Sequence, residues 1–252
     1  MSSGTLAVVG NWLARYLNRP LRDYEPFSVS RLDCLAAVLQ AGDVLLVEGN
    51  LRISTPIKYL TQSTWSHAAL YVGDFGQSGL GVHAPALIEA HLRHGVRAVP
   101  LTEYEGLNTR ICRPVGLDAQ ACTAVCRFAI DRLGFDYDLK HILDLARYLL
   151  PVPPVPARWR RRMLALGSGE PTRAICSTLI AQAFQSVRYP ILPQVERRVA
   201  GSDGDSPGER EVLHIRHYSL FTPRDFDLSP YFRVIKPEVE HEFDHRALTW
   251  RE

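Results

Sequence analysis

The chain has 252 residues, of which 46% are hydrophobic and 22% charged, and this ordinary globular composition excludes a largely disordered chain. Its formal net charge of +2 is too small to indicate nucleic acid as a partner, because duplex-binding proteins usually carry a clustered basic face. The sequence contains no run of roughly 18–20 apolar residues that could cross a bilayer. At roughly 150 residues per domain, the length allows one or two domains.

The cellular compartment is predicted from the N-terminus and the cysteines. The N-terminal segment has no basic residue before its short apolar run and no small-residue cleavage site, so we expect no signal peptide. The cysteines are odd in number and lack the spacing of a disulfide scaffold: they are Cys34, Cys112, Cys122, Cys126 and Cys176. Free thiols are typical of a reducing compartment, and we therefore predict a cytoplasmic protein.

The N-terminal part is predicted to be a helical extension over residues 1–40. Apolar residues recur at helical spacing in 5–18 and 31–40, and Ser30 is the expected N-cap of the second helix. After residue 40 the hydrophobic pattern changes to that of strands.

Strand signals dominate the next part of the chain. Short apolar segments bounded by Gly, Pro and Asp predict a short helix at 55–60 and strands at 43–48, 67–72, 86–90, 96–99 and 109–113. Strands at this spacing are typical of a small, curled antiparallel sheet or barrel.

Helices dominate the chain after residue 118. Helical periodicity predicts helices at 119–133, 139–150, 157–166 and 176–187, then a loop at 200–210 and strands at 212–221 and 231–235. Asp118 is the expected cap of the first of these helices, and Gly134 ends it. Strand-rich and helix-rich parts form separate blocks, so the predicted fold class is α+β. We expect one domain over 41–236 with an insertion at 139–172, followed by a charged tail at 237–252.

Cys176 is the first candidate for chemistry. It stands where a basic, irregular segment gives way to an apolar helix, so its thiol would face the positive end of the helix dipole. This environment lowers the pKa of a thiol toward the thiolate that attacks carbonyl carbons. The alternative is a core cysteine, because most free cysteines are buried.

His67 and Glu89 lie on two predicted strands and could serve Cys176. A His on a strand that faces a Cys on a helix is the arrangement of papain-type thiol enzymes. Glu89 is a single carboxylate in the apolar segment ALIEA, where a charge needs a buried partner or a wet cleft, and His67 could be that partner. The alternatives are a His at a strand edge and a Glu at a rim facing water.

Several short motifs occur in a fixed order: Gly42-Asp43-Val44, Ser66–Gly73, Ile88-Glu89-Ala90 followed by Gly95-Val96, Gly134 to Tyr137-Asp138, and Ile175-Cys176-Ser177. Together with Thr222–Phe226, they resemble the circularly permuted NlpC-type papain-like proteins, in particular the YiiX/YaeF-like group, over 41–236. In the permuted order the His strand precedes the Cys helix, the reverse of papain. The resemblance implies a permuted papain-like fold in which a small antiparallel sheet carries the His and packs on a helix that carries the Cys.

The resemblance also implies the roles of the site residues. Cys176 is then the nucleophile, His67 the general base and Glu89 the group that orients the imidazole. The predicted substrate-binding residues are Tyr71, Trp65 and Ser66, and a place in the core is the alternative for the two aromatic residues.

The function implied by the resemblance is that of a thiol hydrolase. Such proteins commonly hydrolyse amide bonds in peptides or cell-wall material, and relatives such as lecithin retinol acyltransferase move acyl groups through a thioester. We therefore expect cleavage of an amide or ester in a peptide or lipid-linked substrate, without a cofactor. The alternatives are an acyltransferase of that type and a non-catalytic membrane-surface or binding module.

Other candidates carry weaker signals. Cys122 and Cys126 could share a helix face, but no His or second Cys pair completes a zinc site, so no metal site is predicted. His83, His91 and His94 lie near Glu89 in the sequence and could be ligands, alternative bases or surface residues flanking a strand.

The segment 151–166, PVPPVPARWRRRMLAL, combines a stiff proline strap with a basic amphipathic helix. Such a helix can lie on an anionic membrane surface or cover an acyl-binding cleft, and we predict a peripheral membrane contact here. A solvated basic face above a packed apolar side is the alternative.

Overall fold

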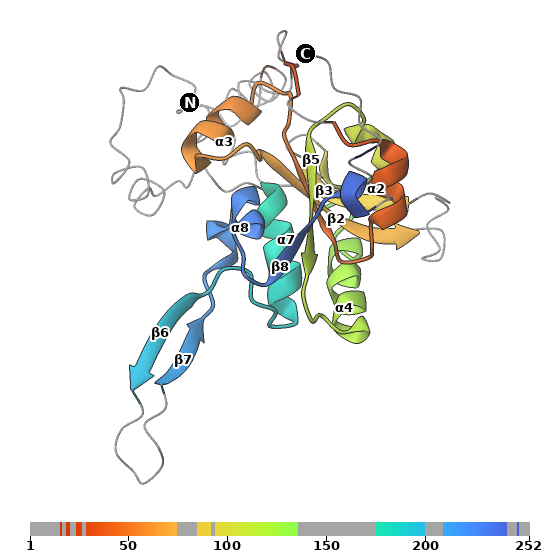
Figure 1. The fold of residues 1–252 in the computed structure, drawn as a ribbon. Coiled ribbons are helices and arrows are strands. Elements are labelled where there is room, and N and C mark those ends of the chain that lie inside the picture. Colours follow the sequence, from red (N-terminus) through yellow and green to blue (C-terminus); the bar gives the residue numbers. More distant parts are fainter. Residues whose placement is uncertain are drawn as a thin grey trace, which may run out of the picture.

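The computed structural model describes residues 16, 19–20, 24–26, 29–74, 85–91, 94–135, 175–199, 209–240 and 246. Within these residues the chain forms a six-stranded sheet with helices packed against it and a separate two-stranded hairpin (Figure 1). This is the predicted α+β class. The predicted helices at 5–18, 139–150 and 157–166 lie outside the described residues, apart from Tyr16.

The six-stranded sheet is antiparallel throughout, in the order β4-β3-β2-β1-β5-β8. Its strands are β1 (Val44–Val47), β2 (His67–Asp74), β3 (Pro85–His91), β4 (Gly95–Pro100), β5 (Thr109–Pro114) and β8 (Phe232–Ile235). All four residues of β1 are buried, as expected for an uninterrupted apolar run between two neighbours in a sheet covered on both faces. Each of these strands was predicted from the sequence to within two residues.

Helices cover both faces of this sheet. The longer ones are α3 (Ser54–Thr61), α4 (Ala119–Ile130) and α7 (Ile175–Ser186), and the shorter ones are α2 (Leu32–Val38), α8 (Pro223–Asp227), α9 (Pro237–Glu240), η2 (Leu101–Tyr104) and η3 (Tyr218–Leu220). α4 and α7 pack on one face, where their apolar residues join Leu46, Ala68 and Leu70 in a core. α2 and η2 cover the other face, above Leu45 and Ala69.

This division follows the alternation of side chains along β2. Ala68 and Leu70 belong to the core under α7, whereas Ala69 and Tyr71 belong to the core under η2. His67, as the first residue of β2, shares the parity of Ala69 and lies at the end of the strand. The pairing of β2 with its neighbouring strands, which forms the two cores, therefore also fixes the position of the His67 imidazole.

Some sequence predictions of local structure were wrong. Arg31, not Ser30, is the N-cap of α2, and it makes no side-chain cap; Asp33 accepts the N–H of Cys34 instead. The strand expected at 212–221 is shorter, because β7 (Glu209–His214) ends before the 3-10 turn of η3. β7 pairs with β6 (Gln194–Val199), a charged strand that the sequence pattern missed, and this hairpin extends away from the sheet (Figure 1).

The start of α4 was predicted correctly, but its end was not. The Asp118 carboxylate accepts the N–H of Ala121 at 2.7 Å, which caps α4 as expected. α4 ends at Ile130, three residues before the predicted end, and Gly134 follows with a positive φ of 80°. Thr222 and Asp225 form a capping box at the start of α8.

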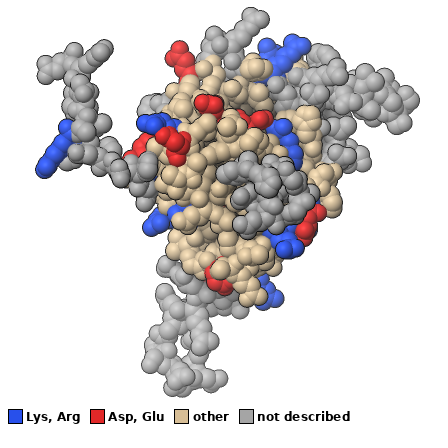
Figure 2. Space-filling model, turned by 90° about the vertical axis from the view of Figure 1, so that its right-hand side faces the viewer, with Lys and Arg blue, Asp and Glu red and all other residues tan. Residues whose placement is uncertain are grey.

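The surface agrees with the small net charge. On the face drawn in Figure 2, Lys and Arg side chains lie interspersed with Asp and Glu side chains around a mostly uncharged area. None of the helices in the described ranges has the length and hydropathy needed to cross a membrane.

Candidate active site

His67 and Glu89 come together across the β2–β3 pair. The register that pairs Leu70 with Ile88 brings Glu89 beside the part of β2 that begins at His67. The Nε2 atom of His67 lies 2.5 Å from Oε2 of Glu89. Glu89 is buried, whereas the His67 side chain keeps 23% of its surface exposed, so the imidazole remains open to a substrate.

Cys176 is the third residue of this group, and it comes from a helix rather than from the sheet. It is the second residue of α7, which packs on β2 and β3, and it is 5% exposed. The charge and hydrogen bonding of the His67 imidazole lower the pKa of the Cys176 thiol, and so does the backbone N–H of Ala68. Since Nε2 of His67 faces Glu89, Nδ1 is the ring nitrogen left for the thiol. The structure thus brings the three predicted catalytic residues into one chain of contacts.

The electrostatics of the chain favour a thiolate and an imidazolium. Burial alone lowers the pKa of His67, but the charges of Cys176 and Glu89 and their hydrogen bonds outweigh burial and raise this pKa to about 10. Burial raises the pKa of Cys176, yet the His67 charge and hydrogen bond bring it below the ordinary thiol value. Both shifts favour the pair in which the imidazole carries the proton and the sulfur carries the negative charge.

Glu89 has two further partners that the sequence did not reveal. The hydroxyl of Tyr104 donates to Oε2 at 2.7 Å, and Nε of Arg97 donates to Oε1 at 2.7 Å. Burial opposes the charge of Glu89, but His67, Tyr104 and Arg97 together hold the pKa of this carboxyl well below its usual range. Arg97 faces Glu89 directly in the β3–β4 register, so correct pairing of these strands could have revealed it. No comparable pattern marks Tyr104, which lies on η2.

Comparison with known proteins finds a family similar to part of this chain. Residues 38–148, which include His67 and Glu89, match the model of the permuted papain-like amidases of YaeF/YiiX type, family C92. This part of the chain is therefore similar to the permuted papain-like amidase family. Cys176 lies beyond the matched residues.

A solved structure is also similar to this chain. The crystal structure described as the metalloprotein yiiX from Escherichia coli O157:H7 is 16% identical in sequence, with a TM-score of 0.46. The similarity covers 78% of this chain and 96% of that one. No curated protein matches the chain by sequence.

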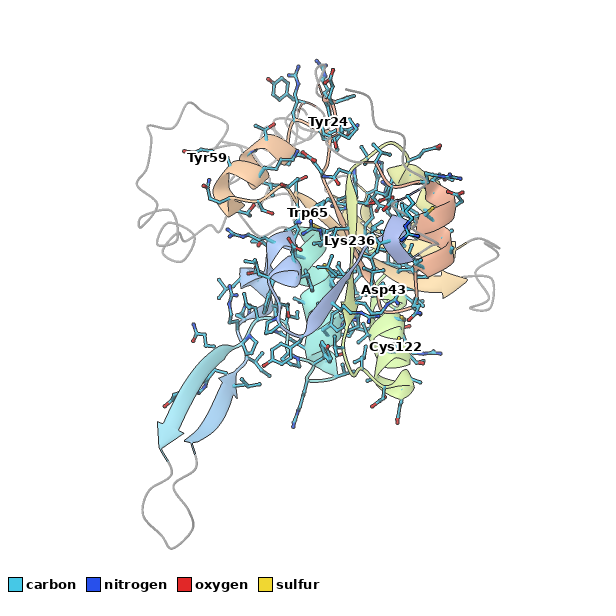
Figure 3. The ribbon with its side chains drawn as sticks, in the orientation of Figure 1. Tyr24, Asp43, Tyr59, Trp65, Cys122 and Lys236 are labelled. Atoms are coloured by element: carbon cyan, nitrogen blue, oxygen red, sulfur yellow. The ribbon has the colours of Figure 1, made fainter. Side chains whose placement is uncertain are left out.

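Of the residues predicted to bind substrate, Trp65 and Ser66 directly precede His67, Tyr71 lies four residues further along β2, and all three are largely buried. The indole N–H of Trp65, labelled in Figure 3, donates to Oδ2 of Asp227 at 3.0 Å. Ser66 accepts the N–H of Gly49 at 3.0 Å, and Tyr71 is 8% exposed in the core under η2. These contacts give all three residues a structural role, and their contact with a substrate stays a prediction.

Of the remaining candidates, Cys122 lies near Ala41, His91 lies near enough to Glu89 and His67 for their charges to act on it, and His83 is outside the described residues. Cys122 lies beside the turn before β1, close to Asp43 (Figure 3), and its thiol donates to the carbonyl of Ala41 at 3.1 Å. His91 stacks on His94 with 4.9 Å between ring centroids, and burial, with the charge of Arg97, lowers the pKa of His91 to about 4. Within the described residues, no group of three or more His, Cys, Asp or Glu side chains could hold a metal ion.

Proposed function

We propose that this protein is a cysteine amidase in which Cys176 attacks the carbonyl carbon of an amide or ester. The observation that carries the proposal is the row of contacts from Cys176 through His67 to Glu89. The match of residues 38–148 to the permuted papain-like amidase family supports the same reaction class. The substrate is proposed to be a peptide or a lipid-linked amide or ester.

The geometry supports a two-step reaction. The Cys176 thiolate adds to the carbonyl, and the imidazolium of His67 donates its Nδ1 proton to the leaving amine or alcohol as the scissile bond breaks. This leaves an acyl thioester on Cys176 and a neutral imidazole. Water then attacks the thioester while His67 accepts the proton of the water, and the acid product leaves as thiolate and imidazolium return. Glu89 keeps the ring oriented through its contact with Nε2.

The start of α7 is suited to stabilise the oxyanion that forms in each step. The N–H groups in the first turn of an α-helix have no partners within the helix and carry the positive end of its dipole. Cys176 lies in this turn of a twelve-residue helix. A carbonyl oxygen that approaches with its carbon next to the sulfur would meet these donors, which are of the kind used in oxyanion holes.

The test is to trap the acyl-enzyme. The protein is incubated with p-nitrophenyl acetate and analysed by peptide mapping, and we expect an acetyl group on Cys176 that neutral hydroxylamine removes. Cys176→Ala should lose the adduct. Cys122→Ser is the matched control, because Cys122 is also expected to be reactive: the hydrogen bond of Cys126 lowers its pKa to about 7, although burial acts in the opposite direction. Acetylation of Cys122 alone, or no thioester at all, would contradict the proposal.

The fate of the thioester separates hydrolysis from acyl transfer. A hydrolase releases acetate at the same rate with or without an added amine or alcohol, whereas an acyltransferase gives the transfer product and turns over faster. Peripheral contact of 151–166 with an anionic membrane belongs to the proposal only through the sequence, since this segment lies outside the described residues. Sedimentation with anionic vesicles at low and high salt tests that contact.

A further inference from the structure

We propose that Tyr104 is a positioning residue of the active site, which acts with Arg97 to fix the Glu89 carboxylate and keep it ionised. Through Glu89, these residues would maintain the charged pair of Cys176 and His67. The inference rests on the proposed function, because it concerns how that catalytic pair is charged.

Tyr104 contacts both groups that stand behind the thiol. Its hydroxyl donates at 2.7 Å to Oε2 of Glu89, the same oxygen that lies 2.5 Å from Nε2 of His67. Its ring is stacked on the imidazole, with 6.4 Å between centroids and 30° between planes. Tyr104 is 4% exposed, so its hydroxyl has little water as an alternative partner. The carboxylate is therefore held in the one orientation that serves His67.

Arg97 balances the charge of the cluster. It occupies the second oxygen of Glu89 at 2.7 Å and also reaches Glu103 at 3.2 Å on the exposed side. With Arg97 present, the thiolate, imidazolium, carboxylate and guanidinium sum to zero charge. Charges are more easily buried when they are paired and hydrogen-bonded, so Arg97 favours the ionised form of the whole set.

The groups that face Glu89 come from each element packed against it. They are His67 on β2, Arg97 on β4, Tyr104 on η2, His91 on β3 itself and, through His67, Cys176 on α7. His91 is uncharged at neutral pH, since its pKa is lowered to about 4. Tyr104 also stays protonated, because burial and the nearby Glu89 charge raise its pKa well above the usual value.

Removing the Tyr104 hydroxyl should change the acid limb of the pH profile of Cys176, which is the range of low pH over which the rate of thiol alkylation rises. Without this donor Glu89 binds a proton at higher pH, and a neutral Glu89 no longer stabilises the imidazolium, so the thiolate forms at higher pH. A hydrogen bond to a charged group corresponds to a pKa change of about one unit. At alkaline pH Glu89 is ionised with or without Tyr104, and the limb set by His67 stays where it was.

The experiment measures the rate of Cys176 alkylation by iodoacetamide from pH 3 to 11, by mass spectrometry of the Cys176 peptide. For Tyr104→Phe we expect the acid limb to move up by about one pH unit, with the alkaline limb unchanged. Arg97→Gln, at a side chain that is 32% exposed, should move the acid limb in the same direction. Tyr189→Phe is the matched control: it also removes a tyrosine hydroxyl, one that donates to the backbone carbonyls of Val115 and Tyr231.

The outcomes separate this proposal from the proposed function. An acid limb that stays in place in both folded variants, or a rate that falls equally at every pH, overturns the role of Tyr104 while the amidase proposal stands. A shift in Tyr189→Phe equal to that in Tyr104→Phe also overturns it, because the effect would then be one of packing. If Cys176 of the unaltered protein reacts with the pH profile of an ordinary thiol, both proposals fail. If Tyr104→Phe does not fold, Arg97→Gln is the deciding variant: an upward shift of its acid limb supports the proposal, and an unchanged acid limb overturns it.

Discussion

Two buried carboxylates in this protein have similar surroundings, but their pKa values shift in opposite directions. Asp43, before β1, and Glu89, on β3, are 1% and 3% exposed, and each is paired with an arginine. Burial raises the pKa of Asp43, and the hydrogen bonds and charge of Arg113 do not fully reverse it. Burial acts on Glu89 in the same direction, but its pKa is strongly lowered.

The difference between them is the imidazolium of His67, whose charge is the largest influence that opposes burial at Glu89. Asp43 accepts the N–H of Gln40 at 2.8 Å and two bonds from Arg113, which fixes the turn into β1. Glu89 is instead linked through His67 to Cys176, so its charge depends on the charge of the thiol pair. An arginine partner alone therefore does not make a carboxylate part of a reactive site in this fold.

The largest expected effect comes from removing the imidazole. His67→Ala should lower the rate of the proposed hydrolysis by about 10²–10⁴-fold, because a general acid–base group contributes that much. The variant should still fold, since Glu89 keeps Tyr104 and Arg97 as partners. Steady-state hydrolysis and thermal melting measure the two, with His214→Ala, which removes an exposed His paired with Glu196, as the control. Equal losses of activity in both variants would contradict the assignment.

The pH profile of thiol alkylation should identify Cys176 directly. Its pKa is lowered and that of His67 is raised to about 10, so the thiolate–imidazolium pair exists between these two values. The rate should rise at a lower pH than that of an ordinary thiol and change again near pH 10, where His67 loses its proton. Labelling by iodoacetamide at pH 6, followed by peptide mapping, should find Cys176 ahead of Cys112, whose pKa burial raises. Faster labelling of Cys122 or Cys126 would refute the assignment.

Exchanging each carboxylate for its amide tests the comparison itself. Asp43→Asn leaves Arg113 without its charge partner and should cost about 3 kcal/mol of unfolding free energy, with little change in activity per folded molecule. Glu89→Gln should lower activity more than Asp43→Asn does, though less than His67→Ala, because the amide keeps the shape and part of the hydrogen bonding. Denaturant melts and rates normalised to folded protein separate the two effects. If Asp43→Asn lost more activity than Glu89→Gln, the contrast drawn above would be wrong.

The smallest effect is expected at Cys122, which lies next to the Asp43 turn. Cys122→Ser keeps a donor for the carbonyl of Ala41, so the unfolding free energy should change by less than about 1 kcal/mol and activity should not change. Chemical denaturation and the hydrolysis assay provide the measurement. A loss of several kcal/mol would show that the turn before β1 depends on the thiol as well as on Asp43.

The sequence predicted the sheet and the contact between Glu89 and His67 better than their surroundings. Strands β1 to β5 carry short apolar runs bounded by turn residues, and the carboxylate inside ALIEA required a partner, which His67 provides. Tyr104 could not be predicted in this way, because η2 reaches Glu89 through the packing of a short turn rather than through a periodic pattern. β6 was missed because its charged residues, QVERRV, do not alternate with apolar ones as in a half-buried strand.

The pairing of β2 makes the active site inseparable from the two cores. Side chains alternate between the faces of a strand, so a shift of one residue in the register exchanges all of them. Such a shift would turn Leu70 out of the core under α7 and would move the imidazole of His67 away from Glu89 at the same time. A deletion or insertion of one residue within β2 should therefore abolish the fold and the site together. Variation that preserves both must be sought in the connections between strands, which is where a lineage of such proteins could acquire new specificities.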